Sequence, residues 1–187
     1  MSFYNRSMIQ KKAIAFPKTI FLTQAIFLSF LIAVSAQISV LFWPIPLTLQ
    51  PIAILTIALA CQPQLAIAAV VAYVIEGTVG FPVFQGMASG LIRPTGGYII
   101  GFVPVVAIVS YFKGNQPSFA HLFKICLLAK VPLFVLGVLW LSSFVGMESA
   151  LNLGLFPFLL KTPVDIAFAI VSCNLIQSFK QRFGFND

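Results

Sequence analysis

The chain has 187 residues, of which 60% are hydrophobic and 8% are charged. An average soluble domain has roughly 25% charged residues, so this composition excludes a soluble enzyme, a disordered tail and a nucleic-acid-binding domain. The net charge is +7, but the basic residues stand at the ends of long apolar runs rather than in a phosphate-binding patch. We therefore expect an integral membrane protein surrounded by lipid, with no nucleic-acid partner.

The first apolar run, Ile20 to Phe42, is long enough to cross a bilayer, since about 20 residues suffice. Val34-Ser35-Ala36 resembles a signal-peptide cleavage site, which leaves a cleaved signal as an alternative. The run is about twice the usual length of a signal core, which favours a retained helix. Four cations precede it: Arg6, Lys11, Lys12 and Lys18.

Within this run, Ala25, Ser29 and Ala33 recur every four residues and fall on one face of a helix. Such a stripe of small residues lets another helix approach closely. From the residues alone, two interpretations stay open. The stripe either packs inside this chain's own bundle or docks a partner membrane protein.

Five further apolar runs follow a Pro-rich break at residues 43–46. These runs are Leu47–Ala60, Leu65–Val79, Tyr98–Phe112, Ala120–Val145 and Leu155–Phe179. A Gly-rich stretch, Gly77–Gly97, lies between the third and fourth runs and is too apolar for a water-exposed linker. Non-helical backbone survives at membrane depth only when it is buried in protein or lines a cavity. We therefore expect this stretch to form part of a site wall.

Six runs predict an all-α integral membrane protein with six transmembrane helices and both termini on one side. Lys18, Lys113, Lys180 and Arg182 fall on that side, whereas Arg93 and Glu148 fall on the other. The positive-inside rule then places both termini in the cytoplasm. We expect a cytoplasmic N-terminal segment at residues 1–19, a six-helix membrane domain at 20–180 and a cytoplasmic tail at 181–187.

Ionisable residues inside membrane segments are costly, so each is a functional hypothesis by default. Lys161 and Asp165 are four residues apart and share one helix face, either as a structural ion pair or as ligand-binding groups. Glu76 and Arg93 fall on the same outer side. Uncharged polar residues accompany them at this level: Thr48, Gln50, Gln85, Thr95 and Tyr98. The pattern predicts an outward-facing pocket for a small, partly apolar molecule with polar ends, against a scatter of interfacial residues.

Enzymatic and metal-binding patterns are weak. The chain has three cysteines without a CxxC pair and a single histidine, His121, so we expect no disulfide framework, metal site or cofactor. No HExxH, GxSxG or Walker lysine motif is present. Two other classes stay open: an intramembrane enzyme with Glu76 or Asp165 as general base, and a purely structural membrane protein.

Three stretches resemble one known family in order and spacing. They run from Ala36 to Gln50, including Pro44-Ile45-Pro46-Leu47-Thr48-Leu49-Gln50, from Glu76 to Phe84, and from Arg93 to Phe102 with its PTGGY-x-x-GF pattern. The combination is similar to the BioY family, the biotin-binding substrate components of energy-coupling-factor vitamin transporters. The resemblance covers residues 20–179. A substrate component for another vitamin is the transport alternative.

The resemblance implies a tight biotin site on the extracytoplasmic side of a prokaryotic plasma membrane. In many members it also implies coupling to a T-component membrane protein and to ABC-type ATPases supplied in trans. The stripe of Ala25, Ser29 and Ala33 is then similar to the family's contact with the T component, which favours the docking interpretation.

The sixth run departs from the family's PGD-x-x-K pattern, whose Asp and Lys contact biotin. The matching stretch here is residues 163–168, in which Asp165 is kept and Phe168 replaces the Lys. Lys161, one turn earlier, is the expected substitute. The departure leaves the ligand open between biotin and a close precursor.

The resemblance also suggests how biotin is held. Asp165 accepts hydrogen bonds from the ureido N–H groups, and Gln50 serves as donor or acceptor. Arg93 or Lys161 meets the carboxylate. Phe81, Phe84 and Tyr98 form the expected apolar wall.

Overall fold

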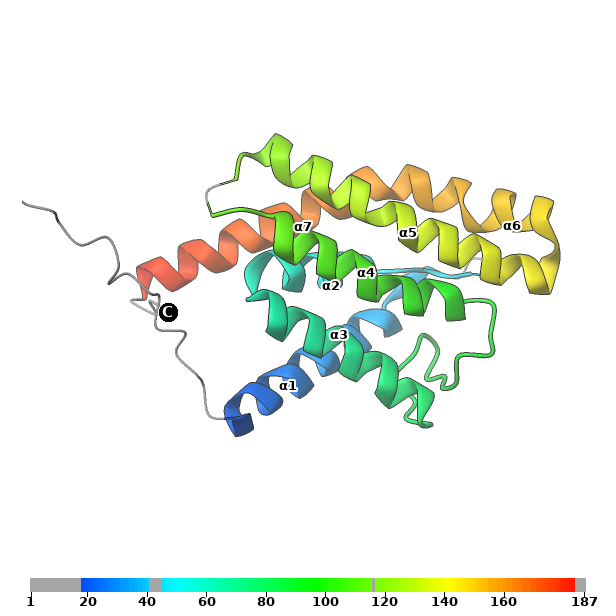
Figure 1. Cartoon of the computed structure of the whole chain (residues 1–187), viewed down its shortest axis with the longest axis horizontal. Helices are drawn as coiled ribbons and strands as arrows, with labels where there is room; N and C mark the ends of the chain where they lie inside the picture. Colours follow the sequence, from blue (N-terminus) through cyan, green and yellow to red (C-terminus); the bar gives the residue numbers. More distant parts are fainter. Residues whose placement is uncertain (1–17, 41–44, 116, 184–187) are drawn as a thin grey trace, which may run out of the picture.

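The structure is a computed structural model that describes residues 18–40, 45–115 and 117–183. Within these ranges the chain forms seven helices and two short strands (Figure 1). In chain order they are α1 (Lys18–Gln37), β1 (Ser39–Val40), β2 (Leu47–Thr48), α2 (Gln50–Ala60), α3 (Pro63–Thr78), α4 (Gly96–Phe112), α5 (Phe119–Val145), α6 (Met147–Gly154) and α7 (Phe156–Arg182). In the view of Figure 1, α1 and α3 lie along the lower side of the bundle and α5 along the upper side.

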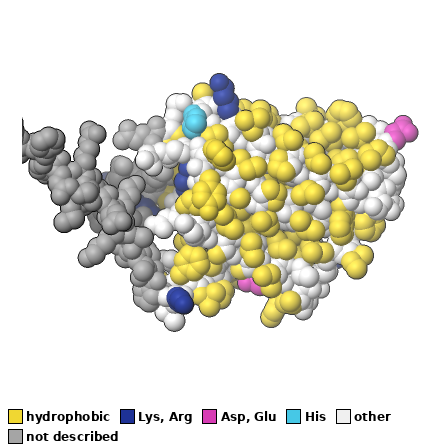
Figure 2. Space-filling view, viewed as in Figure 1, with side chains coloured by type: hydrophobic (Ala, Val, Ile, Leu, Met, Phe, Trp, Pro, Cys, Tyr) yellow, Lys and Arg dark blue, Asp and Glu magenta, His cyan; other side chains and the backbone are white. Residues whose placement is uncertain are grey.

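Three stretches of the described chain are long and apolar enough to cross a membrane: Lys18–Gln37, Phe119–Val145 and Met147–Arg182. The helices α2, α3 and α4 are apolar but shorter. Only Leu155 separates α6 from α7, so these two helices together occupy the place of the sixth predicted span. The prediction of an all-helical membrane protein with six helical spans is confirmed, with the sixth span broken. Hydrophobic side chains cover most of the face shown in Figure 2.

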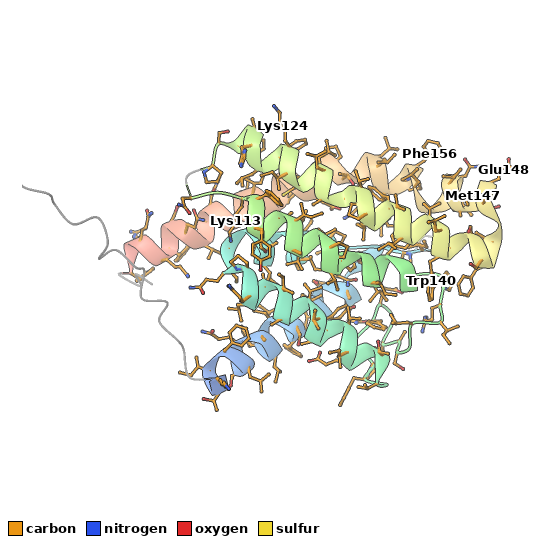
Figure 3. The ribbon with its side chains drawn as sticks, viewed as in Figure 1. Lys113, Lys124, Trp140, Met147, Glu148 and Phe156 are labelled. Atoms are coloured by element: carbon orange, nitrogen blue, oxygen red, sulfur yellow. The ribbon has the colours of Figure 1, made fainter. Side chains whose placement is uncertain are left out.

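Basic residues gather at one end of the bundle, which we call the basic end: Lys18, Lys113, Lys124, Lys180 and Arg182. The helix α1 begins and α7 ends at this same end (Figure 1). Glu148 lies at the opposite end, which we call the far end (Figure 3). The charge asymmetry continues to predict a cytoplasmic basic end. Arg6, Lys11 and Lys12, which entered that prediction, lie outside the described residues.

The helices extend slightly beyond the predicted limits of the membrane domain. The first helix begins at Lys18 and the last continues to Arg182, whereas residues 20–180 were expected. Two elements were not predicted at all. The strands β1 and β2 pair as an antiparallel hairpin, and α6 is set off from α5 by Gly146, whose φ of 81° ends the preceding helix.

Glycines bring α4 and α5 together. A Cβ atom added at Gly97 would collide with the Leu136 carbonyl oxygen and with Trp140, and one at Gly101 would lie 2.9 Å from Leu133 Cδ1. The PTGGY-x-x-GF pattern therefore has a packing role, because only glycine leaves room for the α5 backbone at these two positions. This contact fixes the start of α4 at the far end.

The stripe of small residues on α1 packs inside the bundle. Ala25, Ser29 and Ala33 are all buried, and α1 packs against α3. Their burial within the chain favours the packing interpretation, and docking through these three residues stays a prediction. The outward face of α1 consists instead of large apolar side chains, including Phe27 and Phe30.

At the basic end, Lys113 joins α4 to α2. Its Nζ donates to the carbonyl oxygens of Ala58, Leu59 and Cys61, at 3.1, 2.9 and 2.5 Å. The last carbonyls of a helix have no donors of their own, so this lysine satisfies the C-terminal end of α2.

Candidate functional site

A cavity of about 50 Å³ lies at the far end, between the hairpin and the first turns of α2, α4 and α7. Its lining residues are Ile45, Pro46, Thr48, Gln50, Tyr73, Gln85, Thr95, Tyr98, Ile99, Phe102 and Phe158. All five uncharged polar residues that the sequence placed in an outward-facing pocket are among them. The structure therefore brings these five together, although they come from three separate stretches of the chain, residues 48–50, 85 and 95–98.

Two polar atoms in this cavity wall have no hydrogen-bond partner. They are Nε2 of Gln50, the first residue of α2, and the hydroxyl oxygen of Tyr73 in α3. Gln50 is 5% exposed and Tyr73 is fully buried. Buried polar groups are nearly always paired, because an unpaired one costs about 1–3 kcal/mol. Unpaired groups that line a cavity are groups available to a polar ligand.

Other polar residues of the wall are held in place. The Tyr98 hydroxyl donates to the Gly154 carbonyl oxygen at 2.8 Å, and its ring stacks on Phe158 with 5.7 Å between centroids. Gln85 Nε2 donates to Ser39 Oγ at 3.2 Å. Tyr98 thus offers a ligand an apolar ring with its hydroxyl already bonded, while Gln85 is tied to β1.

The Gly-rich loop, residues 79–95, supplies Gln85 and Thr95 to the wall and is fastened by one side chain of α1. Gln37 Nε2 donates to the carbonyl oxygens of Val83 and Phe84, at 3.3 and 3.1 Å, and Gln37 Oε1 accepts from the Met87 N–H at 3.1 Å. Gln85 and Thr95 of this non-helical stretch line the cavity, and a role for the stretch in a binding site stays a prediction. Sequence reasoning assigned no role to Gln37.

A charged cluster adjoins the cavity through Thr48. Asp165 of α7 is 2% exposed and forms ion pairs with two lysines, one through each carboxylate oxygen. Lys161 contacts Oδ1 from the same helix, as the four-residue spacing predicted, and Lys130 Nζ of α5 lies 3.3 Å from Oδ2. Lys161 also donates to the Thr48 carbonyl oxygen at 3.0 Å. Neither Lys161 nor Asp165 is itself among the residues that line the cavity.

Lys130 is the member of this cluster that sequence reasoning missed. It lies near the middle of α5 and is 3% exposed. The signal was present, since a lysine inside an apolar run is by default a functional hypothesis. Phe168, which takes the place of the family's lysine, is exposed on the outer surface of α7 and does not join the cluster.

Four predicted residues lie away from the cavity. Arg93 is exposed, and its carbonyl oxygen accepts from Trp140 Nε1 at 2.9 Å. Glu76 lies at the α1–α3 contact, where it accepts from Ser29. Phe81 is exposed, and Phe84 packs edge-on against Tyr73 in the core. Of the expected apolar wall, only Tyr98 lines the cavity, where Ile45, Ile99 and Phe102 accompany it.

Neither metal nor nucleophilic chemistry has a visible basis in the site. Among residues 18–40, 45–115 and 117–183, no three His, Cys, Asp or Glu side chains are placed to hold a metal ion. The arrangement is suited to binding, because the cavity has apolar walls and polar atoms without partners and adjoins the charged cluster.

Comparison with known sequences identifies one family. The model of the BioY family matches residues 8–182. A protein of Pyrococcus horikoshii named "Probable biotin transporter BioY" is 34% identical over 150 residues, which cover 79% of this chain and 90% of the relative. The "Biotin transporter BioY" of Thermotoga maritima is 33% identical over 132 residues, which cover 68% of this chain and 78% of the relative.

One solved structure has the same fold. The crystal structure of the S-component for biotin from an ECF-type ABC transporter superposes with a TM-score of 0.71. It covers 88% of this chain and 92% of its own, at 22% sequence identity. At this identity the likeness establishes the arrangement of the helices and not the role of any side chain.

Proposed function

The chain belongs to the BioY family, and on this basis we propose that it is the biotin-binding membrane component of a transporter. It binds biotin at the far end of the bundle and takes part in its passage to the basic end. The observation that carries the proposal is the cavity at the far end, where Gln50 and Tyr73 present unpaired polar atoms beside apolar walls. The function is binding and transport, and we assign no catalytic residue.

Biotin has the mixture of groups that this site accommodates. Its ureido ring offers two N–H donors and a carbonyl acceptor, which match the amide of Gln50 and the hydroxyl of Tyr73. Its thioether ring and alkyl chain are apolar and suit Tyr98, Ile99 and Phe102. A site with paired polar groups rejects analogues that lack them, because its own groups are then left without partners.

Binding requires the cavity to widen. Its volume of about 50 Å³ lies well below the ~300–1,000 Å³ of typical ligand pockets. The loop 79–95 and the hairpin supply part of the wall and are joined to the helices by a small set of hydrogen bonds, including those of Gln37, Trp140 and Lys161. We propose that they move outward to admit the ligand.

We further propose that transport uses a T-component membrane protein and ABC-type ATPases supplied in trans. Support comes from the solved structure of the same fold, which is the S-component for biotin from an ECF-type ABC transporter. The buried stripe on α1 does not support a contact through Ala25, Ser29 and Ala33. We assign the contact to no residue of this chain.

The experiment that tests the proposal is calorimetric titration of the detergent-purified chain with biotin, desthiobiotin and thiamine. We expect tight binding of biotin, weaker binding of desthiobiotin and none of thiamine, with the ligand recovered unchanged. If a folded chain fails to bind biotin, the family name describes the scaffold alone. If the ligand is converted, the chain is an enzyme.

Asp165→Asn provides the matched variant for this titration. It removes the buried charged acceptor that we expect to receive an N–H group of the ureido ring. We expect biotin affinity to fall at least about tenfold, as for the loss of a charge-assisted hydrogen bond. Equal affinities of the two proteins would contradict a role for Asp165 in binding.

A further inference from the structure

The charged cluster behind the cavity contains one cation more than its carboxylate requires. Asp165 pairs with both Lys130 and Lys161, and no other acidic side chain joins the cluster within the described residues. One lysine is enough to neutralise one carboxylate. A second lysine at this depth is costly unless an anion matches it. The surplus charge therefore needs a partner that the described chain itself does not supply.

The two lysines differ in how exposed their side chains are. The side chains of Lys130 and Asp165 are 4% and 3% exposed, whereas that of Lys161 is 23% exposed. Lys161 Nζ also reaches the carbonyl oxygen of Thr48, a residue of the cavity wall. Of the two cations, Lys161 is the one placed to meet a ligand.

Lys130 is held as a fixed partner of the carboxylate. Its Nζ donates to Thr162 Oγ1 at 3.4 Å as well as to Asp165 at 3.3 Å. Thr162 in turn donates to the carbonyl oxygen of Phe158, one turn earlier in α7, at 2.8 Å. The lysine thus bridges α5 to α7 and stays on Asp165 Oδ2 whatever Lys161 does.

From this geometry we infer that Lys130 is the permanent counterion of Asp165, which frees Lys161 to bind the carboxylate of the ligand. When the ligand enters, Lys161 turns from Asp165 Oδ1 to the incoming carboxylate, and Asp165 keeps its neutralising partner. The cluster then holds two cations and two anions. Lys130 acts as a positioning residue, and Lys161 is the ligand-binding residue. The inference rests on the proposed function, since it takes biotin as the ligand.

The test compares biotin with biotinamide, which has the same rings and chain but no charge. The ratio of their dissociation constants, biotinamide over biotin, isolates the interaction with the carboxylate, because every other contact is common to both ligands. The full-length chain in detergent is titrated calorimetrically with each ligand. We expect a ratio of at least about ten, the value for one charge-assisted hydrogen bond.

Four variants separate the two roles. Lys161→Met is expected to bring the ratio close to one. Lys130→Met is expected to lower the ratio about tenfold, because Asp165 then competes with the ligand for Lys161. Lys130→Arg keeps the charge and is expected to preserve the ratio. The double variant Lys130→Met/Asp165→Asn removes both the counterion and the carboxylate that competes with the ligand for Lys161. The ratio is therefore expected to return to the wild-type value.

Lys124→Met is the matched control, since Lys124 is an exposed lysine of the same helix at the basic end. Thermal melting in detergent identifies folded variants. If a single variant fails to fold, the double variant offers a second test, because it removes both fully buried charges and leaves only the partly exposed Lys161. A Lys130→Met protein that loses affinity for both ligands equally would overturn the inference in favour of a structural lysine. A ratio that survives Lys161→Met but not Arg93→Met would assign the carboxylate to Arg93 instead.

Failure of the inference is distinct from failure of the proposed function. A folded wild-type chain that binds biotin and biotinamide equally tightly would overturn the inference and leave biotin binding intact. A folded chain that binds neither would contradict the proposed function itself.

Discussion

The hydroxyl of Ser29 donates to the carboxylate of Glu76, 2.9 Å from Oε1 and 3.1 Å from Oε2, across the contact between α1 and α3. The same hydroxyl lies 2.8 Å from the Ile26 carbonyl oxygen in its own helix. Ser29 was expected to contact a partner protein, and Glu76 was considered as a general base. Both are instead engaged with each other inside the bundle.

Ser29→Ala is expected to destabilise the chain, because the variant leaves the half-buried Glu76 carboxylate without this donor. The expected loss is about 1–3 kcal/mol, the cost of an unpaired acceptor. Thermal melting in detergent measures it. Ser35→Ala is the control, since the only hydrogen bond of its hydroxyl among the described contacts is to Ile32 of its own helix. Equal melting temperatures of the two variants would refute the stabilising role of the pair.

Ala33→Leu is expected to impair folding, because the new side chain enters a buried contact. Overpacking of this kind costs about 1–3 kcal/mol. Biotin binding and cellular uptake should then fall together, in proportion to the folded protein recovered. Val34→Leu, at a neighbouring exposed position, should change neither. Loss of uptake with intact binding in Ala33→Leu would instead restore the docking interpretation.

Tyr73→Phe is expected to weaken biotin binding without loss of stability. The hydroxyl of Tyr73 lies beside the Gln50 side chain without a well-formed hydrogen bond, so its removal eliminates a poorly paired buried group. Melting temperature should be equal or higher, while affinity falls about five- to tenfold with the lost hydrogen bond. Tyr111→Phe, at an exposed position, is the control. Unchanged affinity in Tyr73→Phe would mean that this hydroxyl does not face the ligand.

Gln37→Ala is expected to loosen the loop that covers part of the cavity. The variant removes the three hydrogen bonds that hold the loop near Phe84 and Met87. Hydrogen exchange should become faster at the Met87 amide and its neighbours, with little change in α5. Gln177→Ala, at an exposed position of α7, serves as the comparison. Equal exchange in both variants would argue that the loop is held by its backbone alone.

The level of a residue within the membrane could be predicted from the sequence, but its direction could not. Thr48, Gln85 and Thr95 were grouped because each follows or precedes a span on the outer side, and the cavity contains all three. Arg93 and Glu76 share that level and point elsewhere. Counting residues from a span end gives depth along the bundle. Rotation about the helix axis depends on packing against neighbours that the sequence does not identify.

Lys130 and the stripe on α1 illustrate two further gaps. The run from Ala120 to Val145 is so apolar that it was read as a plain membrane span, and Lys130 within it received no role. The structure buries this lysine against Asp165, within the charged cluster. Spacing identified Ala25, Ser29 and Ala33 as a close-packing face but did not identify what packs there. Small residues permit approach by any helix, and α3 of the same chain is the one that approaches.

The cap that Lys113 places on α2 limits how the molecule opens. If α2 and α4 separated at the basic end, the three carbonyl oxygens would lose the Lys113 ammonium as a donor, and that ammonium would lose its three acceptors. The opposite ends of the same two helices carry Gln50 and Tyr98 into the cavity wall. The lysine therefore holds the two helices together at the basic end, and we expect any separation of α2 from α4 to occur at the far end, beside the cavity.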